Sequence, residues 1–448
     1  MFEFGRELKR LFGAEGSADG VTGGDASLLE LLDLSMLRGE GRAVAIAAGR
    51  VGAKDPPRRQ LEAAVVWREI ARRTGDSAAL RKAAQLAERA AAGFDRVQRP
   101  KGWAEARCEQ GRCALLGAEL FGDNGLNAAA DIAFREAKVA AGSGLVFGYA
   151  AAGQLVIEAR AALAQADLAT VVELSRRFEP TLTLLRSHAR RHPDARLAAA
   201  ELRLVRADLL SAAGLRLKDP VLLRQALDDL ARDIENLDPA YEPLTWGRAA
   251  MLRGAVRAGL AEMDGELAEI AAAVAELAKV LESLRCDHSP LDWTRGQQAL
   301  AGALQMLGEA ADSDRAFQQA IGCYDRALMV FGDKPALSER AHAVYHRAVC
   351  LARRAEITCD LEGLDEAEAA LRAELAGSGA SRDPVGWAVR QLNFARLYEA
   401  RVGVTGLDRG ERAASAVALS AALDVFGEHG LRSLADTTAR RLEELRAH

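Results

Sequence analysis

Two stretches of the chain, 47 residues apart, carry the same pattern. Residues 243–277 are PLTWGRAAMLRGAVRAGLAEMDGELAEIAAAVAEL, and residues 290–324 are PLDWTRGQQALAGALQMLGEAADSDRAFQQAIGCY. Each begins with Pro-x-x-Trp, has a small residue eight positions after the Trp, and reaches an Ala nineteen positions later. Self-similarity at a fixed period of this length predicts stacked supersecondary units.

The pattern recurs along most of the chain. Four of the five Trp follow a Pro by three positions and precede a small residue by eight. The Trp are Trp103, Trp246, Trp293 and Trp387, and the small residues are Gly111, Gly254, Ala301 and Ala395. Ala64, Ala207 and Ala348 continue the period. Between residues 145 and 190 the spacing breaks, and there we take Ala159, with Phe178 as its counterpart, as the missing member.

We interpret each unit as a helical hairpin. A first helix, A, carries the small residue, and a second helix, B, carries the Ala nineteen positions later, so that the two residues meet where the helices cross. The seven B-helix residues are Ala83, Ala130, Ala226, Ala273, Ala320, Ala367 and Ala414. Pro starts helix A without losing a hydrogen bond. The Trp should then be substantially buried at the junction between units, because one hairpin cannot bury its own apolar faces.

The B helices resemble those of the tetratricopeptide repeat superfamily. An Ala-x-x-x-Phe/Tyr-x-x-Ala signature is present at Ala130–Phe134–Ala137 and Ala320–Tyr324–Ala327, and a weaker form at Ala414–Ala418–Ala421. The resemblance covers about residues 56–428 and implies an all-α fold, an α-solenoid of stacked antiparallel helical hairpins. The period departs from the usual repeat of about 34 residues. A HEAT-like array is the structural alternative, because its period overlaps 47 residues.

The ends of the chain lie outside the repeat. Residues 26–55 are expected to form a capping hairpin with its turn at Gly39 and Gly41, and residues 429–448 a capping helix. Residues 1–12 (MFEFGRELKRLF) have the pattern of a short amphipathic helix, and residues 13–25 read as a flexible linker. That short helix is a candidate contact for a membrane surface or a partner; the alternative is that it packs on the array or frays.

Composition narrows the functional classes. The formal net charge of −5 argues against a general nucleic-acid binder, which needs an excess of basic residues. The six Cys form no Cys-x-x-Cys pair, which indicates a reducing compartment and, with no secretory signal visible, a cytoplasmic protein. The longest uncharged run, residues 139–157, contains four Gly and is expected to be a buried repeat helix and not a transmembrane segment.

No catalytic or cofactor motif is recognisable. The chain lacks a phosphate-binding Gly-rich loop, a dinucleotide motif and a nucleophile elbow. Two His pairs, His188/His192 and His342/His346, have the i, i+4 spacing of zinc ligands, but Ala189 and Ala343 stand where a zinc protease has Glu. We therefore expect no enzyme, no metal site and no cofactor.

The expected function is a non-catalytic scaffold or adaptor that binds partner proteins or peptides on the concave face. The alternatives are a ligand- or peptide-sensing regulator and a helical-repeat RNA-binding protein, the latter disfavoured by the acidic balance. Positions six and three before, and one and four after, each small residue form a helical stripe. That stripe contains the candidate partner-binding residues Arg112, Arg248, Arg295, Arg396 and His342, among acids such as Glu105, Glu201, Asp208 and Glu399. Because Arg binds carboxylates in a bidentate manner, we expect an acidic peptide; the alternative is that these Arg form intramolecular ion pairs.

Overall fold

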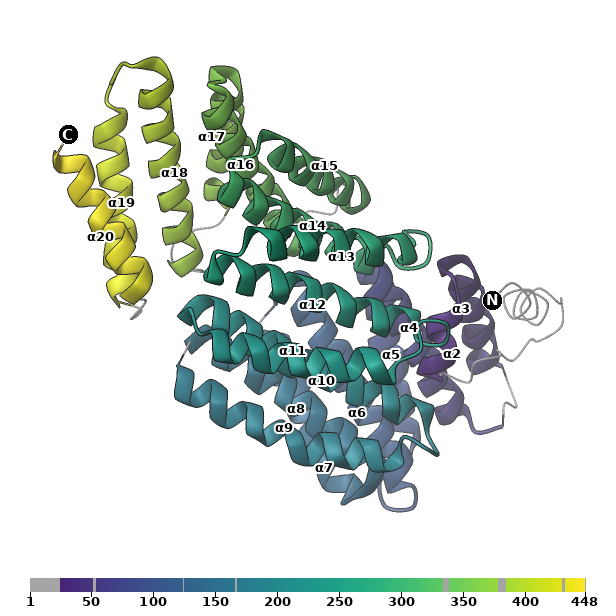
Figure 1. Cartoon of the computed structure of the whole chain (residues 1–448). Helices are drawn as coiled ribbons and strands as arrows, with labels where there is room; N and C mark the ends of the chain where they lie inside the picture. The colour runs from purple at the N-terminus through teal and green to yellow at the C-terminus, as the bar shows by residue number, and fades with distance from the viewer. Residues whose placement is uncertain are drawn as a thin grey trace. The chain divides into compact units, whose positions relative to one another are not determined.

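The computed structural model describes residues 25–50, 54–123, 125–165, 167–332, 338–377, 384–428 and 432–447. Within those ranges the chain is all-helical, with no strand. Consecutive helices form eight antiparallel pairs, as expected for an all-α repeat array (Figure 1). The predicted helix over residues 1–12 and the linker over 13–24 lie outside the described residues.

Each pair has a long A helix and a shorter B helix. The A helices are α4 (Pro56–Thr74), α6 (Pro100–Phe121), α8 (Gly144–Gln165), α10 (Pro193–Leu217), α12 (Pro243–Asp264), α14 (Pro290–Ala311), α16 (Ser338–Thr358) and α18 (Pro384–Thr405). The B helices are α5 (Ser77–Gly93), α7 (Gly125–Ala141), α9 (Leu168–His188), α11 (Pro220–Asn236), α13 (Leu267–Ser283), α15 (Asp314–Phe331), α17 (Leu361–Gly377) and α19 (Glu411–Glu428).

The turn from helix A to helix B follows one rule. Among the described turns, the first residue after the A helix is left-handed in seven pairs, at Gly75, Gly122, Lys218, Gly265, Asp312, Cys359 and Gly406. A short polar residue then caps the B helix, as Asp76, Asp219 and Ser313 do by accepting hydrogen bonds from its first amides. A left-handed C-terminal residue followed by a capping side chain satisfies both helix ends within two residues.

The small residue of helix A makes room for a large residue of helix B. A Cβ on Gly111 would lie 2.7 Å from the Phe134 ring, and a Cβ on Gly254 would lie 2.6 Å from Leu277. Both partners stand 23 positions after the glycine, at the aromatic position of the signature. The side chain nearest to the glycine is thus the one at +23, while the expected +19 residues, Ala130 and Ala273, are fully buried in the same B helices.

The irregular unit departs from the regular spacing. Gly153 of α8 faces the preceding B helix: a Cβ there would strike the Phe134 ring of α7, the same ring that faces Gly111. Phe134 thus fills the space between α6 and α8. The expected pair of this unit, Ala159 and Phe178, belongs to one buried apolar cluster.

The last pair is also shifted by one residue. In α19 the buried residues are Ser415, Ala418, Leu419, Ala422 and Phe426, whereas Ala414 is only half-buried. The signature therefore reads Ser415–Leu419–Ala422 and not Ala414–Ala418–Ala421. The turn before α19 spans residues 406–410, longer than the turns of two or three residues in the other pairs, and it absorbs the extra residue.

The four repeat Trp occupy one position of helix A. Trp103, Trp246, Trp293 and Trp387 are each the fourth residue of a 22-residue helix that begins with Pro. All four are mostly buried, as expected, with a smaller part of each residue exposed. Trp103 shows the reason: its ring contacts a core cluster with Leu61 and Phe94, while Arg96 covers it with the guanidinium carbon 4.6 Å from the ring centroid.

The ends of the array pack on neighbouring helices. At the N-terminal end, α2 (Ala26–Leu31) and α3 (Leu34–Gly49) meet at Leu32 and Asp33, so the expected turn at Gly39 and Gly41 is wrong. Asp33 caps α3, and Gly41 lies inside the helix, where its carbonyl accepts a hydrogen bond from the Trp67 indole at 3.1 Å. At the C-terminal end, α20 (Arg432–Ala447) packs on α19 through Leu442.

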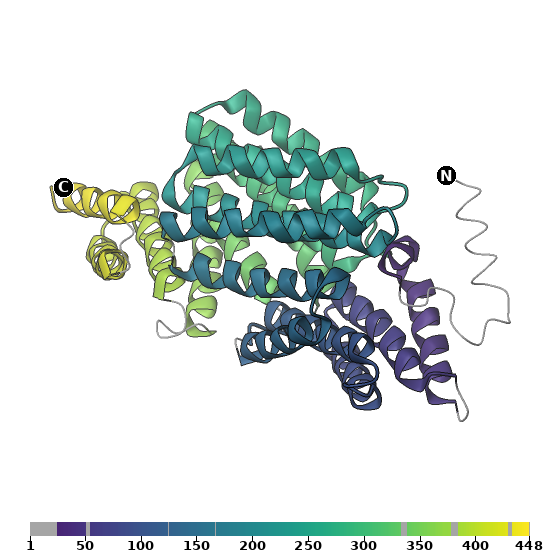
Figure 2. The same cartoon turned by 90° about the horizontal axis from the view of Figure 1, so that it is seen from below.

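The described chain forms two compact units. Unit 1 comprises residues 25–264 and 272–299, and unit 2 comprises residues 265–271, 300–332 and 339–447. The largest apolar cluster of unit 1 runs through α8 to α12, where helices stack side by side in both views (Figure 2). The main cluster of unit 2 lies on α16, α17 and α18. Among the described residues, no helix is long and apolar enough to cross a membrane.

Candidate functional site

The predicted stripe on the A helices forms an ion-pair ladder. Arg58 of α4 reaches Glu105 of α6, with Nη1 2.7 Å from Oε2, and Arg248 of α12 reaches Glu201 of α10, with Nη2 3.2 Å from Oε1. The partners in each pair are 47 residues apart, because the same stripe position recurs in successive A helices. We call this surface the A-helix wall.

The other predicted partner-binding residues also have intramolecular contacts. Arg295 lies 2.7 Å from Glu119, Arg396 lies 3.1 Å from Glu309, and Arg112 lies over the Tyr149 ring with its guanidinium carbon 4.6 Å from the centroid. The His342 ring packs against that of His346, with centroids 4.2 Å apart. A partner that binds Arg295 or Arg396 would have to compete with an internal carboxylate.

In unit 1 the ladder continues into buried charge pairs. Arg72 of α4 hydrogen-bonds Asp292 of α14 at 3.0 Å and Glu69 of its own helix at 2.8 Å. Burial raises the pKa of Asp292, but Arg72, then Arg248 and Arg295, outweigh it and hold that pKa well below the usual range. These carboxylates stay ionised because several guanidinium groups replace the lost water. The pairs join α4 and α6 to α14, helices far apart in the sequence.

One end of the A-helix wall in unit 1 holds a segment of the chain itself. Arg73 of α4 is fully buried and donates to the carbonyls of Leu29 and Leu32, both at 2.6 Å. The His288 ring, Nε2, lies 2.8 Å from the carbonyl oxygen of Glu30. Leu29 and Leu32 are themselves buried. Helix α2 is thus held through its backbone and its apolar side chains, as a bound peptide would be.

The side chain of Glu30 is the polar anchor of that segment. Its carboxylate accepts hydrogen bonds from the amides of Leu244 and Thr245 at 3.2 Å and from the Thr245 hydroxyl. Arg248 approaches to 3.7 Å. The amides belong to the first turn of α12, where free N–H groups and the helix dipole favour an anion. Burial raises the pKa of Glu30, and Arg248 and Thr245 partly offset that rise.

A second polar contact fixes the start of α2. Asp25 caps the helix, and the amide of Ala26 donates to Asp194 of α10 at 2.8 Å. Ala26 also packs with Leu197 and Trp246. Burial, together with the neighbouring carboxyl of Asp25, raises the pKa of Asp194 to about 6. We call the surface formed by Arg73, Asp194, Thr245, Arg248 and His288 the α2 seat.

Most of the α2 seat escaped the sequence reasoning. Arg248 lies on the predicted stripe, but Arg73, Asp194, Thr245 and His288 do not, since they follow no shared repeat position. One signal was available: Glu30 is the single acid inside the apolar run LLELL. An acid in such a run needs a polar partner when the run is buried.

Unit 2 has its own polar cluster between α16 and α18. Arg353 and Arg396 both reach Glu309 of α14, and beside them a narrow hollow is lined by Val349, Asn393 and Leu397. The Asn393 amide donates to the Tyr345 hydroxyl across the two helices. Burial lowers the pKa of His346 to about 3, so the His342/His346 pair is uncharged at neutral pH. No group of three metal-ligating side chains exists among the described residues.

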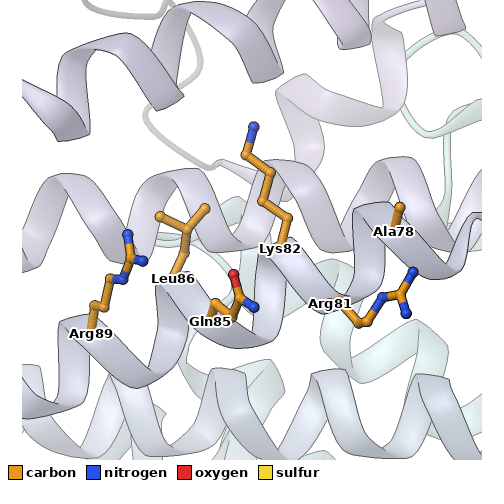
Figure 3. A pocket seen from close by; sticks show the side chains of 6 residues that line it. All are labelled: Ala78, Arg81, Lys82, Gln85, Leu86 and Arg89. Atoms are coloured by element: carbon orange, nitrogen blue, oxygen red, sulfur yellow. The ribbon is translucent and has the colours of Figure 1, made fainter.

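A shallower hollow lies on the outer helix α5. Figure 3 shows Arg81, Lys82, Gln85 and Arg89 rising from this single helix. Lys82 lies against a neighbouring helix: its Nζ lies 3.7 Å from the centroid of the Trp67 ring. The row is basic and exposed, as the outer face of a B helix commonly is.

Comparisons with known proteins give fold neighbours only. No family model matches the chain, and no curated protein does. A Rap protein complexed with competence and sporulation factor is 12% identical with a TM-score of 0.46, over 88% of this chain and 98% of that one. Aspartyl phosphate phosphatase F from Bacillus subtilis is 13% identical with a TM-score of 0.36, over 89% and 95%. A circular tandem repeat protein is 16% identical with a TM-score of 0.27, over 88% and 97%.

Proposed function

We propose that the protein is a non-catalytic scaffold that binds partner proteins through short, helical, carboxylate-bearing segments held on the A-helix wall. We further propose that its array is a long-period relative of the tetratricopeptide repeat superfamily. The observation that supports the function is the α2 seat. There, the wall holds a peptide segment by two carbonyls, an apolar pair and one glutamate.

The chemistry of the α2 seat defines the expected partner segment. Arg73 binds carbonyls that any sequence provides, so it gives affinity without specificity. The α12 amides, Thr245 and Arg248 bind a carboxylate, and charge-assisted hydrogen bonds of this kind are among the strongest in proteins. A partner should therefore present Glu or Asp on a short helix with a Leu on either side.

A regulatory function is the second candidate, and one observation favours it. The seat is occupied by the chain's own α2, so a partner segment has to displace it. A tethered segment competes at a high effective concentration, on the order of millimolar. Binding would then be strong only after α2 has been released, which is the behaviour of a switch.

The test supplies the segment in trans. The full chain with Leu29→Ser/Glu30→Ala has a weakened α2, and the probe is the synthetic peptide DASLLELLD, residues 25–33, with blocked ends. The peptide should raise the Tm of this variant and leave the Tm of the unaltered chain unchanged. A peptide with Ala in place of its Glu should have no effect. Should the double variant not fold, Glu30→Gln serves in its place.

Two single Arg variants sharpen the test. Adding Arg248→Ala to the weakened chain should reduce the peptide's effect, because Arg248 lies next to the carboxylate site. Adding Arg295→Ala should not, because Arg295 pairs with Glu119. If the peptide fails to raise the Tm of both weakened variants, α2 is a fixed cap and the proposal is refuted. The released variant is also the bait for affinity capture from cell extract.

A further inference from the structure

One position of the A helices is Arg in α18. Five residues before the small residue, four A helices have a small buried side chain, at Ala106, Ala249, Gly296 and Ala343. In α10 this position is Leu202, in α4 it is Arg59, which pairs with Glu62, and in α18 it is Arg390. Arg390 therefore places a guanidinium group where most of its counterparts are small or apolar.

Arg390 has no acceptor there. Its Nε and Nη1 are buried, and no hydrogen-bond partner reaches them in the part of the chain that the structure describes. The guanidinium carbon lies 5.8 Å from the centroid of the Tyr345 ring. A buried charge without a counter-ion is costly, and such groups are rare in folded proteins. The other Arg of unit 2 near this wall, Arg353 and Arg396, both have Glu309.

The groups near Arg390 are neutral donors and acceptors. Asn393, one turn further along α18, donates to the Tyr345 hydroxyl. The Tyr345 ring lies edge-on to His346 with centroids 5.0 Å apart, and burial raises the pKa of Tyr345 to about 12. His342 and His346 are uncharged at neutral pH because burial lowers the pKa of each. None of these groups supplies the negative charge that a guanidinium requires.

We propose that Arg390, flanked by Tyr345 and Asn393, is an anion-binding site of unit 2 that takes an oxyanion, the carboxylate or phosphate group of a ligand. The planar guanidinium presents paired donors that match the oxygens of either group. Arg390 is half-buried as a residue and its Nη2 is not among the buried atoms, so an anion can approach the guanidinium group from that side. This site does not depend on the α2 seat of unit 1, and it can exist whether or not that seat binds a partner.

The proposal predicts opposite effects on stability and on binding. In chloride buffer, Arg390→Met should raise the Tm of the full chain, because it removes a buried charge that lacks a partner. Arg390→Ala introduces the residue found at this position in α6, α12 and α16 and should do the same. Inorganic phosphate and glutarate, added at matched ionic strength, should raise the Tm of the unaltered chain in proportion to the logarithm of their concentration.

The variants should then lose this response. Loss of a charge-assisted contact weakens binding by about ten- to hundredfold, so either substitution should abolish stabilisation at concentrations that saturate the unaltered chain. Arg440→Met, an exposed Arg of unit 2, controls for general salt effects. A response to glutarate alone identifies a carboxylate ligand, and a response to phosphate alone a phosphate ligand. A lower Tm in both Arg390 variants, or an anion response that they retain, overturns the proposal.

Discussion

At the scale of single residues, the glycines of the A helices are the most constrained positions. Gly254 is buried, and any Cβ there would lie within 2.6 Å of Leu277. Gly302, in the neighbouring A helix, has open space around the same atom. The two positions look alike in sequence, since both are Gly within an Ala-rich helix. Only their distance in sequence from the preceding Trp distinguishes Gly254 from Gly302.

Gly254→Leu should lower the free energy of unfolding by about 1–3 kcal/mol, because overpacking of the crossing forces α12 and α13 apart. Gly302→Ala should be neutral or more stable by up to about 1 kcal/mol, since Ala is the better helix former. Urea denaturation of both variants measures the difference. Equal stabilities would mean that the crossing between α12 and α13 is misplaced.

At the scale of helices, the sequence predicts the regular pairs well and the exceptions poorly. Pro-x-x-Trp and the small residue place α6, α12, α14 and α18, because each element obeys the same spacing. The close approach of Gly153 to Phe134 was not expected, because the turn between α7 and α8 is short and the regular spacing is interrupted there. The fold of α2 and α3 was missed because Gly39 and Gly41 suggest a turn, while Gly41 in fact lies inside α3, where a Cβ would come within 2.9 Å of the Ile70 side chain.

The candidate site was predicted only in part, for a similar reason. A stripe along the A helices can be read from the period, and it contains Arg248 and Arg295. Contacts between residues far apart in sequence, such as Arg73 with α2 or Arg72 with Asp292, follow from how the helices stack and leave no periodic trace. Arg390 was equally hidden, because an Arg in a helix is normally exposed.

Helix α2 should bind its seat less strongly as the pH rises. The pKa of Asp194 is raised to about 6 in the folded protein, so its contribution to stability is complete below the ordinary pKa near 4 and is lost as the pH passes through 6. His288 has the opposite effect. Burial lowers its pKa, so at low pH the ring must lose a proton before α2 can bind, which weakens the binding of α2. The difference in unfolding free energy between the unaltered chain and Asp194→Asn gives the contribution of the Asp194 carboxyl group alone.

Between pH 5 and pH 7.5, the unaltered chain should lose about 1 kcal/mol of unfolding free energy relative to Asp194→Asn. Chemical denaturation at both pH values gives this quantity. Parallel pH profiles for the two proteins would show that Asp194 does not carry a raised pKa. Arg112, which lowers that pKa, is left in place in both.

At the scale of the molecule, charge pairs within unit 1 connect distant repeats. Arg72 pairs with Asp292 across 220 residues of sequence, and Arg295 with Glu119 across 176. In a repeat array without such links, stability is roughly a sum of nearest-neighbour terms. Unit 1 should instead lose its structure as a single body.

Asp292→Ala tests this cooperativity. It leaves Arg72 buried beside Glu69 alone, and breaking a buried pair costs about 3 kcal/mol or more. Hydrogen exchange of the unaltered chain should show α4 to α14 of unit 1 opening together, and in the variant α4 and α5 should exchange earlier than the rest. Glu173→Ala, in an exposed pair with Arg176, should cost less than about 1 kcal/mol. Early exchange of α4 and α5 already in the unaltered chain would contradict the idea.

The ion-pair ladder restricts how this chain can evolve. Repeat arrays are commonly regarded as modular, with units gained or lost by duplication or deletion. Here Arg248 forms ion pairs with Glu201 in the preceding A helix and with Glu30 of α2. Arg295 pairs with Glu119 of a helix several repeats away. Deleting or duplicating one 47-residue unit would leave at least one of these charges without its partner. The number of repeats in unit 1 is therefore fixed by charge, and sequence change should accumulate within units and not in their count.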